Sequence, residues 1–198
     1  MPHRGDDCLL NSTDEDEAAL GMHAPDSPIP SPREALRAAT GPLHQAVEAR
    51  FEQLDLAERE DYGAFLLAHA QVIPVLEDAL DRAGIEASVP DWARRRRAPS
   101  LARDLTELGL TWPRRDAIAV APGAEALGVA YVLEGSRLGA ATLLKTIPDG
   151  LPRFFLSHGR DEHLFRSFLP ILAAVQDVAA AVAGARRAFG LFLADRAA

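Results

Sequence analysis

Two glycines within one helical segment are the residues of this chain with the clearest chemical meaning. Gly135 and Gly139 lie in the run 128–145, which is otherwise rich in helix-forming residues. An interior glycine costs about 1 kcal/mol relative to alanine, and residues four apart share one face of a helix. Two interpretations remain: a close crossing with another helix, or a helix backbone that lies directly over a planar cofactor.

A histidine with charged neighbours in an earlier segment favours the cofactor. His44 shares a line along its helix with Arg37, about two turns before it, and with Glu48, one turn after it. Imidazole is a common metal ligand, and a carboxylate usually holds the ring nitrogen that does not bind the metal. Taken alone, His44 also fits an ordinary surface position.

The segment that carries His44 opens with a helix start signal. Ser31 stands at the N-cap, Pro32 at the first helical position and Glu34 completes a capping box. Apolar residues then recur with the period of an amphipathic helix, at Leu36, Ala39, Leu43, Val47, Phe51 and Leu54.

The rest of the chain also predicts helices, and strand signals are nearly absent. The fold class expected is therefore an all-α helical bundle. The expected elements are a helix over 61–81 kinked at Pro74, a short helix over 101–108 capped by Ser100, the glycine-bearing helix after Pro122-Gly123, and a helical region over 162–195 bent at Pro170.

Length and charge divide the chain into two parts. Its 198 residues predict one domain. Residues 1–30 hold seven acidic residues against one arginine, a net charge of −6 out of the total of −8. Such a segment lacks the apolar area that would offset its ordering entropy. We expect a disordered acidic tail over 1–30 and one folded domain over 31–198.

The sequence predicts a cytoplasmic protein. It lacks a basic start followed by an apolar run, and we expect no membrane-spanning stretch. The one cysteine, Cys8, falls in the acidic tail, which argues against a disulfide framework and against a thiolate ligand.

Other kinds of site fit the sequence poorly. A di-iron bundle needs Glu-x-x-His pairs, which are absent. Zinc-hydrolase spacing and dinucleotide or phosphate loops are absent as well. His69 is interpreted as a core or boundary residue.

The run Arg94–Arg97 is interpreted as a solvated loop. It is isolated in an acidic protein and has no interleaved aromatic residues, which argues against nucleic acid. A docking patch for an acidic electron donor is the other hypothesis.

Two motifs in this order resemble the heme oxygenase family, and more specifically its bacterial branch that makes biliverdin, often for bacteriophytochromes. Leu36-x-x-Ala39-Thr40-x-x-Leu43-His44 is similar to the family's proximal helix. Tyr131-Val132-Leu133-Glu134-Gly135-Ser136-x-Leu138-Gly139 is similar to its distal helix. The resemblance runs from about Ser31 to the end of the chain.

The resemblance implies heme as both cofactor and substrate, held between the two helices. It makes His44 the axial ligand of the heme iron, and Gly135 and Gly139 the glycines whose backbone borders dioxygen. It implies conversion to biliverdin, carbon monoxide and ferrous iron, with electrons from a ferredoxin or a reductase, and a bacteriophytochrome as a possible acceptor. Ser136 stands where many members carry aspartate and Ala140 replaces a glycine, so ordered water near Ser136 is expected to deliver protons.

Further cations are candidates for holding the heme propionates. They are Arg37, Arg166, Arg186 and Arg187, and Phe189 is a candidate for lining the porphyrin edge. Ordinary surface charge or core packing explains Arg166, Arg186, Arg187 and Phe189 equally well. Two alternatives also stay open: a heme-binding or heme-sensing protein without turnover, and a relative that uses the same bundle for another small molecule or for protein contacts.

Overall fold

The computed structural model describes residues 30–112, 116–160 and 162–194, and every regular element in those ranges is helical. The predicted all-α fold is confirmed. The predicted disordered tail lies outside the described residues except for Pro30, and Cys8 lies outside them as well.

The first helix, α1 (Pro32–Phe51), begins as the sequence predicts. The amide of Glu34 donates to Ser31 Oγ at 3.3 Å, and the amide of Ser31 donates to Glu34 Oε2 at 2.8 Å, which completes the capping box. Leu36 and Thr40 are its buried residues. Leu43, Val47 and Phe51 pack against the core while partly exposed, so α1 lies at the surface of the bundle.

The predicted helix over 61–81 is two helices, α2 (Arg59–Ala70) and α3 (Ile73–Arg82). Pro74 lies in the first turn of α3, where its missing N–H costs nothing, so the chain starts a new helix instead of kinking one. Contrary to the expectation of no membrane-spanning stretch, Arg59–Arg82 is long and apolar enough to be one by composition. Its most apolar window is 61% buried within the protein, as core helices are.

A buried carboxylate determines where the next helices lie. After the short η1 (Ile85–Ala87) and α4 (Trp92–Arg95), helix α5 (Ala98–Glu107) begins before Ser100, so the predicted cap is wrong. The amides of Arg97 and Ala98 instead donate to the carboxylate of Glu77 on α3, at 2.6 and 3.1 Å. A contact between distant segments thus replaces the local cap that the sequence predicts.

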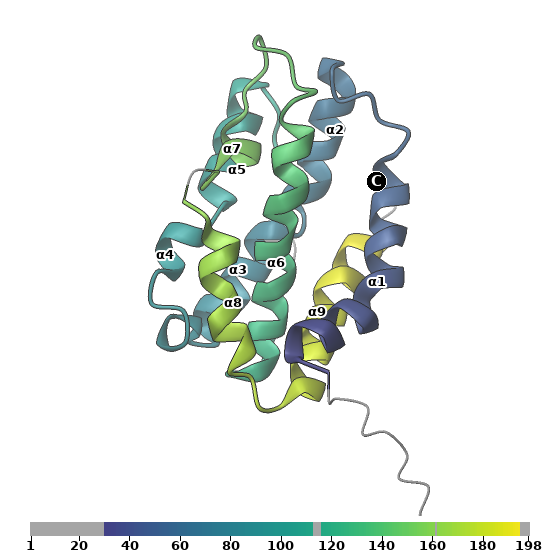
Figure 1. Ribbon diagram of the computed structural model, residues 1–198. Coiled ribbons are helices and arrows are strands. Elements are labelled where there is room, and N and C mark those ends of the chain that lie inside the picture. Colours follow the sequence, from purple (N-terminus) through teal and green to yellow (C-terminus); the bar gives the residue numbers. More distant parts are fainter. Residues whose placement is uncertain (1–29, 113–115, 161, 195–198) are drawn as a thin grey trace, which may run out of the picture.

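The glycine-bearing helix is α6 (Ala124–Leu143), and it begins after Pro122-Gly123 as predicted. It crosses α9 (Val178–Leu193) at very short range. A Cβ on Gly128 would lie 1.8 Å from the carbonyl oxygen of Ala181, and one on Gly184 would lie 2.0 Å from that of Glu125. These two glycines let the helix backbones touch, and α6 and α9 pack side by side within the bundle (Figure 1).

The C-terminal region contains α7 (Phe154–Ser157), α8 (Leu164–Ala173) and α9. The predicted bend at Pro170 is wrong, because Pro170 lies inside α8 and the chain turns after it, over 174–177. There the side chain of Asp177 accepts a hydrogen bond from the amide of Ala180 at 2.9 Å and starts α9. The turn brings α9 back between α6 and α1 (Figure 1).

Candidate functional site

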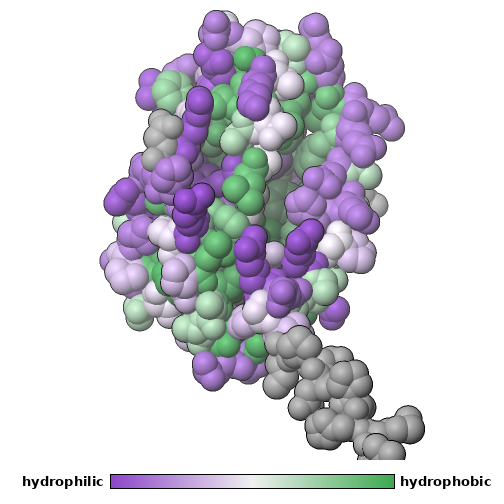
Figure 2. All heavy atoms as spheres, viewed as in Figure 1, coloured by the Kyte–Doolittle hydropathy of each residue, from purple (hydrophilic) through white to green (hydrophobic). Residues whose placement is uncertain are grey.

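The two helices that carry the sequence motifs lie on either side of a hollow. Helix α9 packs against both α1 and α6 and separates them. On the face shown in Figure 2 the surface is hollowed between α6 and α1, and hydrophobic residues gather along the hollow. Its walls are thus the helix of His44 and the helix of Gly135 and Gly139.

Gly135 and Gly139 have no close backbone neighbour from another helix, unlike Gly128. A Cβ on Gly135 would meet only a ring atom of Phe165, at 4.0 Å, and one on Gly139 would meet nothing within 4 Å. Beside them, Leu138 is 60% exposed and is the exposed large hydrophobic residue among those described. The helix-crossing interpretation therefore applies to Gly128 and not to Gly135 or Gly139, where no other backbone lies within 4 Å of an added Cβ.

His44 on the opposite wall has one ring nitrogen engaged and one available. Its Nδ1 lies 3.2 Å from Oε2 of Glu48, one turn along α1. No described residue contacts Nε2 through a hydrogen bond. The ring meets Phe189 of α9 edge to face, with centroids 6.0 Å apart and an interplanar angle of 77°. The sequence-predicted trio of His44, Glu48 and Phe189 therefore lies together, with 57% of the His44 side chain exposed.

One end of the hollow is cationic. Arg37 is exposed on α1, and Arg33, one turn before it, places its guanidinium 5.9 Å from the centroid of Phe165. Burial raises the pKa of Tyr131, while Arg33 and Arg37 act to lower it, so both cations are close to the phenol. Sequence reasoning missed Tyr131, although its spacing with Gly135 and Gly139, four residues each, puts it on the same face of α6.

The other predicted cations lie in different surroundings. Arg166 is exposed on α8. Arg186 donates from Nε to the carbonyl oxygen of Ala39 on α1, at 3.5 Å. Arg187 is engaged elsewhere: it donates to the carbonyl oxygen of Ala119 at 2.7 Å and pairs with Glu125 at 3.3 Å. The structure thus places Arg187 beside α6 and apart from His44 and Phe189.

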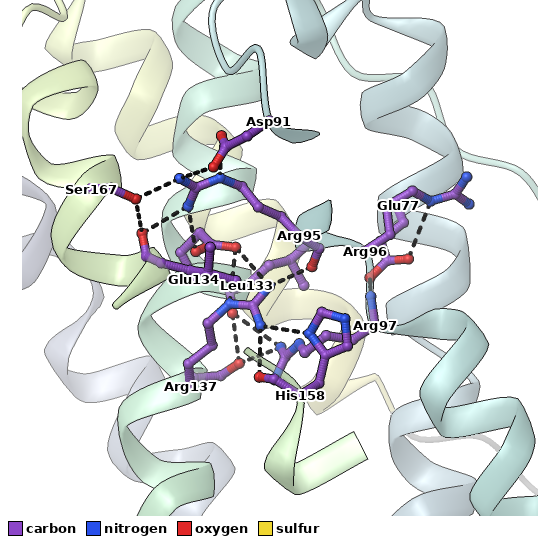
Figure 3. A network of polar contacts seen from close by, with 12 residues as sticks. Glu77, Asp91, Arg95, Arg96, Arg97, Leu133, Glu134, Arg137, His158 and Ser167 are labelled. Carbon is purple, nitrogen blue, oxygen red and sulfur yellow. Dashed lines mark hydrogen bonds and ion pairs between the residues drawn. The ribbon is translucent and has the colours of Figure 1, made fainter. Parts of the chain in front are cut away.

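The interpretation of Arg94–Arg97 as a solvated loop is wrong. Arg95 and Arg97 are each only 2% exposed. Arg95 forms two hydrogen bonds to Asp91, at 2.7 and 2.9 Å, and pairs with the buried Glu134 of α6 at 2.8 Å (Figure 3). Arg94 stays at the surface. Tertiary partners explain the difference, because Arg95 pairs with the buried carboxylate of Glu134 and Arg97 binds groups of α6.

Arg97 reaches the glycine motif itself. Its Nη2 donates to Ser136 Oγ at 2.6 Å and to the carbonyl oxygen of Leu133 at 3.0 Å, and its guanidinium lies 4.9 Å from the centroid of Phe155. Burial, followed by the charge of Arg137, lowers the pKa of Arg97 to about 10, so it remains a cation at neutral pH. The sequence carried no signal for this contact, which joins residues 39 apart.

A second arginine completes this buried network. Arg137 binds Glu134 through Nε at 3.1 Å and Nη2 at 3.0 Å, and its Nη1 donates to Nδ1 of His158 at 3.1 Å (Figure 3). Burial lowers the pKa of His158, and the charges of Arg137 and Arg97 lower it further. The network joins α6 to α4, to α8 and to the end of α7.

His69 lies among aromatic rings, as expected of a core residue. Its Nδ1 is 2.8 Å from the carbonyl oxygen of Phe65, so Nδ1 carries the proton. Burial lowers the pKa of His69 to about 4, and Arg97 contributes in the same direction. His69 is therefore neutral at neutral pH. Its ring neighbours are Phe51, Phe65, Phe155 and Phe192.

A separate groove of about 390 Å³ lies between the C-terminal part of α6 and the region of α7. Ala141 near the end of α6 lines it together with Leu144 and Lys145, which follow the helix. It brings cations together but no histidine, so it lacks the ligand chemistry of the hollow beside His44.

Comparisons with known proteins agree with this geometry. No family model matches the chain, and no curated protein matches it. Among solved structures, the chain is similar to the heme oxygenase of Neisseria meningitidis, solved with NO and CO bound, with a TM-score of 0.69 and 25% sequence identity. The match covers 83% of this chain and 89% of that one. The chain therefore has the heme oxygenase fold, and the likeness supports a relationship to the heme oxygenase family.

Proposed function

We propose that this protein is a heme oxygenase that binds heme in the hollow between α1 and α6 and uses it as cofactor and substrate. One observation carries the proposal: an added Cβ would meet nothing within 4 Å at Gly139 and only a ring atom of Phe165, at 4.0 Å, at Gly135, and the helix across the hollow carries a histidine whose Nδ1 faces Glu48. A flat macrocycle is the ligand that needs bare backbone on one face and an axial nitrogen on the other.

His44 is the proposed axial ligand of the heme iron through Nε2. Oε2 of Glu48 lies 3.2 Å from Nδ1, where the carboxylate would hold the proton on Nδ1 and so leave Nε2 for the iron. Neutral imidazole supplies less electron density than a thiolate, so it does not favour early cleavage of the O–O bond. Phe189 packs on the ring edge and limits its rotation.

The cationic end of the hollow suits the propionates of heme. Arg37 and Arg33 are exposed on one wall and Tyr131 stands on the other, so carboxylates there gain charge-assisted hydrogen bonds. Arg166 is the further candidate, since it lies exposed on the adjoining helix. Arg187 contributes indirectly, because its pairing with Glu125 supports the α6–α9 crossing.

The glycine face is where dioxygen would react. Because Gly135 and Gly139 carry no Cβ, dioxygen can lie against the helix and be directed toward the rim of the macrocycle. Ser136 would hold a water there as the source of protons. With electrons from a ferredoxin or a reductase, the products are biliverdin, carbon monoxide and ferrous iron.

The finer assignments follow from the sequence resemblance. We propose a cytoplasmic protein of the bacterial biliverdin-producing branch, with one domain over 31–198 after an acidic tail and a bacteriophytochrome as the acceptor of biliverdin. Mixing the product with a bacteriophytochrome apoprotein tests the last point. Absence of pigment attachment would contradict it.

A hemin titration tests the main proposal. The wild-type protein should show a Soret band at one hemin per chain, and His44→Ala should lose the axial ligation. His163→Asn is the matched control, because His163 is an exposed histidine with φ of 50° that asparagine tolerates. Reductant in air should then replace the Soret band by biliverdin absorption. Binding without pigment, with a competent reductase present, would indicate a heme-binding or heme-sensing protein, and absence of binding would overturn the proposal.

A further inference from the structure

The hydroxyl of Ser136 has its proton already committed. It donates to the carbonyl oxygen of Leu133 at 2.8 Å, and it accepts from Arg97 Nη2 at 2.6 Å. A serine hydroxyl has one donor and two acceptor positions. One acceptor position is left, and Ser136 is an exposed residue that directly follows Gly135. In this arrangement Ser136 can receive a hydrogen bond from a ligand or a water, but it cannot donate one.

Arg97 is held rigidly on the far side of Ser136. Its own amide is bound by Glu77 at 2.6 Å, at the start of α5, and its guanidinium lies against the ring of Phe155. The arginine is 2% exposed, so its position does not depend on solvent. Helix α3 therefore sets the start of α5, and α5 sets the place of the cation behind the glycine motif.

One nitrogen of Arg97 binds both the hydroxyl of Ser136 and the carbonyl oxygen that accepts the proton of this hydroxyl. Nη2 donates to Ser136 Oγ and to the carbonyl oxygen of Leu133, which is also the acceptor of the serine proton. The guanidinium of Arg97, the hydroxyl of Ser136 and the carbonyl group of Leu133 are thus joined to one another by three hydrogen bonds. Rotation of the hydroxyl toward the hollow would break its bond to Leu133 and direct its proton away from an oxygen that is held in place.

We propose that Arg97 is a positioning residue: it fixes the hydroxyl of Ser136 so that Oγ faces the hollow only as a hydrogen-bond acceptor. This inference rests on the proposed function. A water at Ser136 then donates one O–H to Oγ and keeps its second O–H for the dioxygen side of the heme. Ser136 orients the proton donor and is not the donor itself.

A double-mutant cycle on Arg97 and Ser136 tests the inference. The variants are Ser136→Ala, Arg97→Met and the double variant, each as its ferric hemin complex. The readout is the pH midpoint of the acid-to-alkaline change in the absorption spectrum, which responds to hydrogen bonding beside the iron and needs no turnover. Arg97→Lys is the conservative variant, and Arg94→Met is the control from the same arginine run, because Arg94 pairs with Glu162 at the surface.

Coupling is the expected result. Arg97→Met should shift the midpoint in the wild-type background and shift it differently in the Ser136→Ala background, where only the loss of charge remains. Arg97→Lys should restore part of the shift, and Arg94→Met should leave the midpoint unchanged. Biliverdin formation should fall roughly tenfold in Arg97→Met and no further in the double variant.

Equal shifts in both backgrounds would overturn the inference, since Arg97 would then act by charge or stability alone. Should Arg97→Met fail to fold by circular dichroism, the cycle is run with Arg97→Lys, and additivity there overturns it equally. Failure of the proposed function is distinguishable, because it appears as absent or His44-independent hemin binding in the wild-type protein.

Discussion

The backbone of α6 at Gly128 touches the carbonyl oxygen of Ala181, so that an added Cβ would lie 1.8 Å from it. Further along the same helix, Gly139 faces open space. In the heme-free protein Gly128→Ala should lower the free energy of unfolding by about 1–3 kcal/mol, since the helices must move apart. Gly139→Ala should raise it by about 0.5–1 kcal/mol, because alanine favours the helix. Urea unfolding measures both, and effects of equal sign would contradict the distinction between them.

Gly139→Leu should obstruct the hollow and leave the fold intact. A leucine side chain there enters the space assigned to dioxygen and displaces the reacting atoms, so biliverdin formation should fall on the order of 10²-fold. Ligation by His44 on the opposite wall should persist in the Soret spectrum. Gly190→Leu is the control, because Gly190 is also a helical glycine with nothing within 4 Å of an added Cβ, and it lies on α9. Unchanged turnover in Gly139→Leu would refute the placement of dioxygen.

Glu48→Leu should weaken hemin binding. The change removes the acceptor 3.2 Å from Nδ1 of His44, which frees the ring to turn and the proton to move to Nε2. The pair is exposed, so we expect about a tenfold loss of affinity, the lower end of the usual effect. Glu52→Leu, one turn further along and equal in charge, is the control. Equal affinity of the Glu48→Leu and Glu52→Leu variants would argue against a role for Glu48.

Arg95→Met and Arg94→Met should differ strongly although the residues are adjacent. Arg95 is 1% exposed in its side chain and pairs with Glu134, which is equally buried. Its loss leaves the buried Glu134 with Arg137 as its remaining cation and removes the bonds to Asp91, so it should lower the free energy of unfolding by about 3 kcal/mol. Arg94 is 65% exposed, and its loss should change the free energy of unfolding by no more than about 0.5 kcal/mol. Guanidinium unfolding at neutral pH compares them, and a stable Arg95→Met protein would contradict the buried network.

The heme-free protein should lose stability as the pH falls from about 6.5 to about 4. Burial lowers the pKa of His69 from 6.5 to about 4 in the folded protein, so the unfolded chain binds the proton first. Between these values the unfolded state holds more protons, and stability therefore rises with pH. The full effect of His69 is up to about 3 kcal/mol. The lowered pKa of His158 acts in the same direction. His69→Gln should flatten the dependence, and an unchanged slope in that variant would show that His69 titrates normally.

The sequence by itself determined the all-α class, the start of α1 and the two motifs of the candidate site. These are local matters: the capping box of Ser31 and Glu34 closes within one turn, and the spacing of Tyr131, Gly135 and Gly139 sets one helix face. The pairing of His44 with Glu48 is local too, at one turn of helix. Short-range geometry suffices for each of them.

Only the tertiary structure decided which glycines cross a helix and which arginines are buried. Gly128 and Gly139 cannot be told apart in the sequence. They differ in the structure because the backbone of Ala181 lies against Gly128 and nothing lies against Gly139. The sequence predicts that Arg95 and Arg97 are solvated. In the structure they bind Glu134 and Ser136, each 39 residues away in the chain. The start of α5 depends on Glu77 in the same way. A charge is buried only where partners that bind it are already placed, a carboxylate for Arg95 and oxygen acceptors for Arg97, and these partners come from another part of the chain.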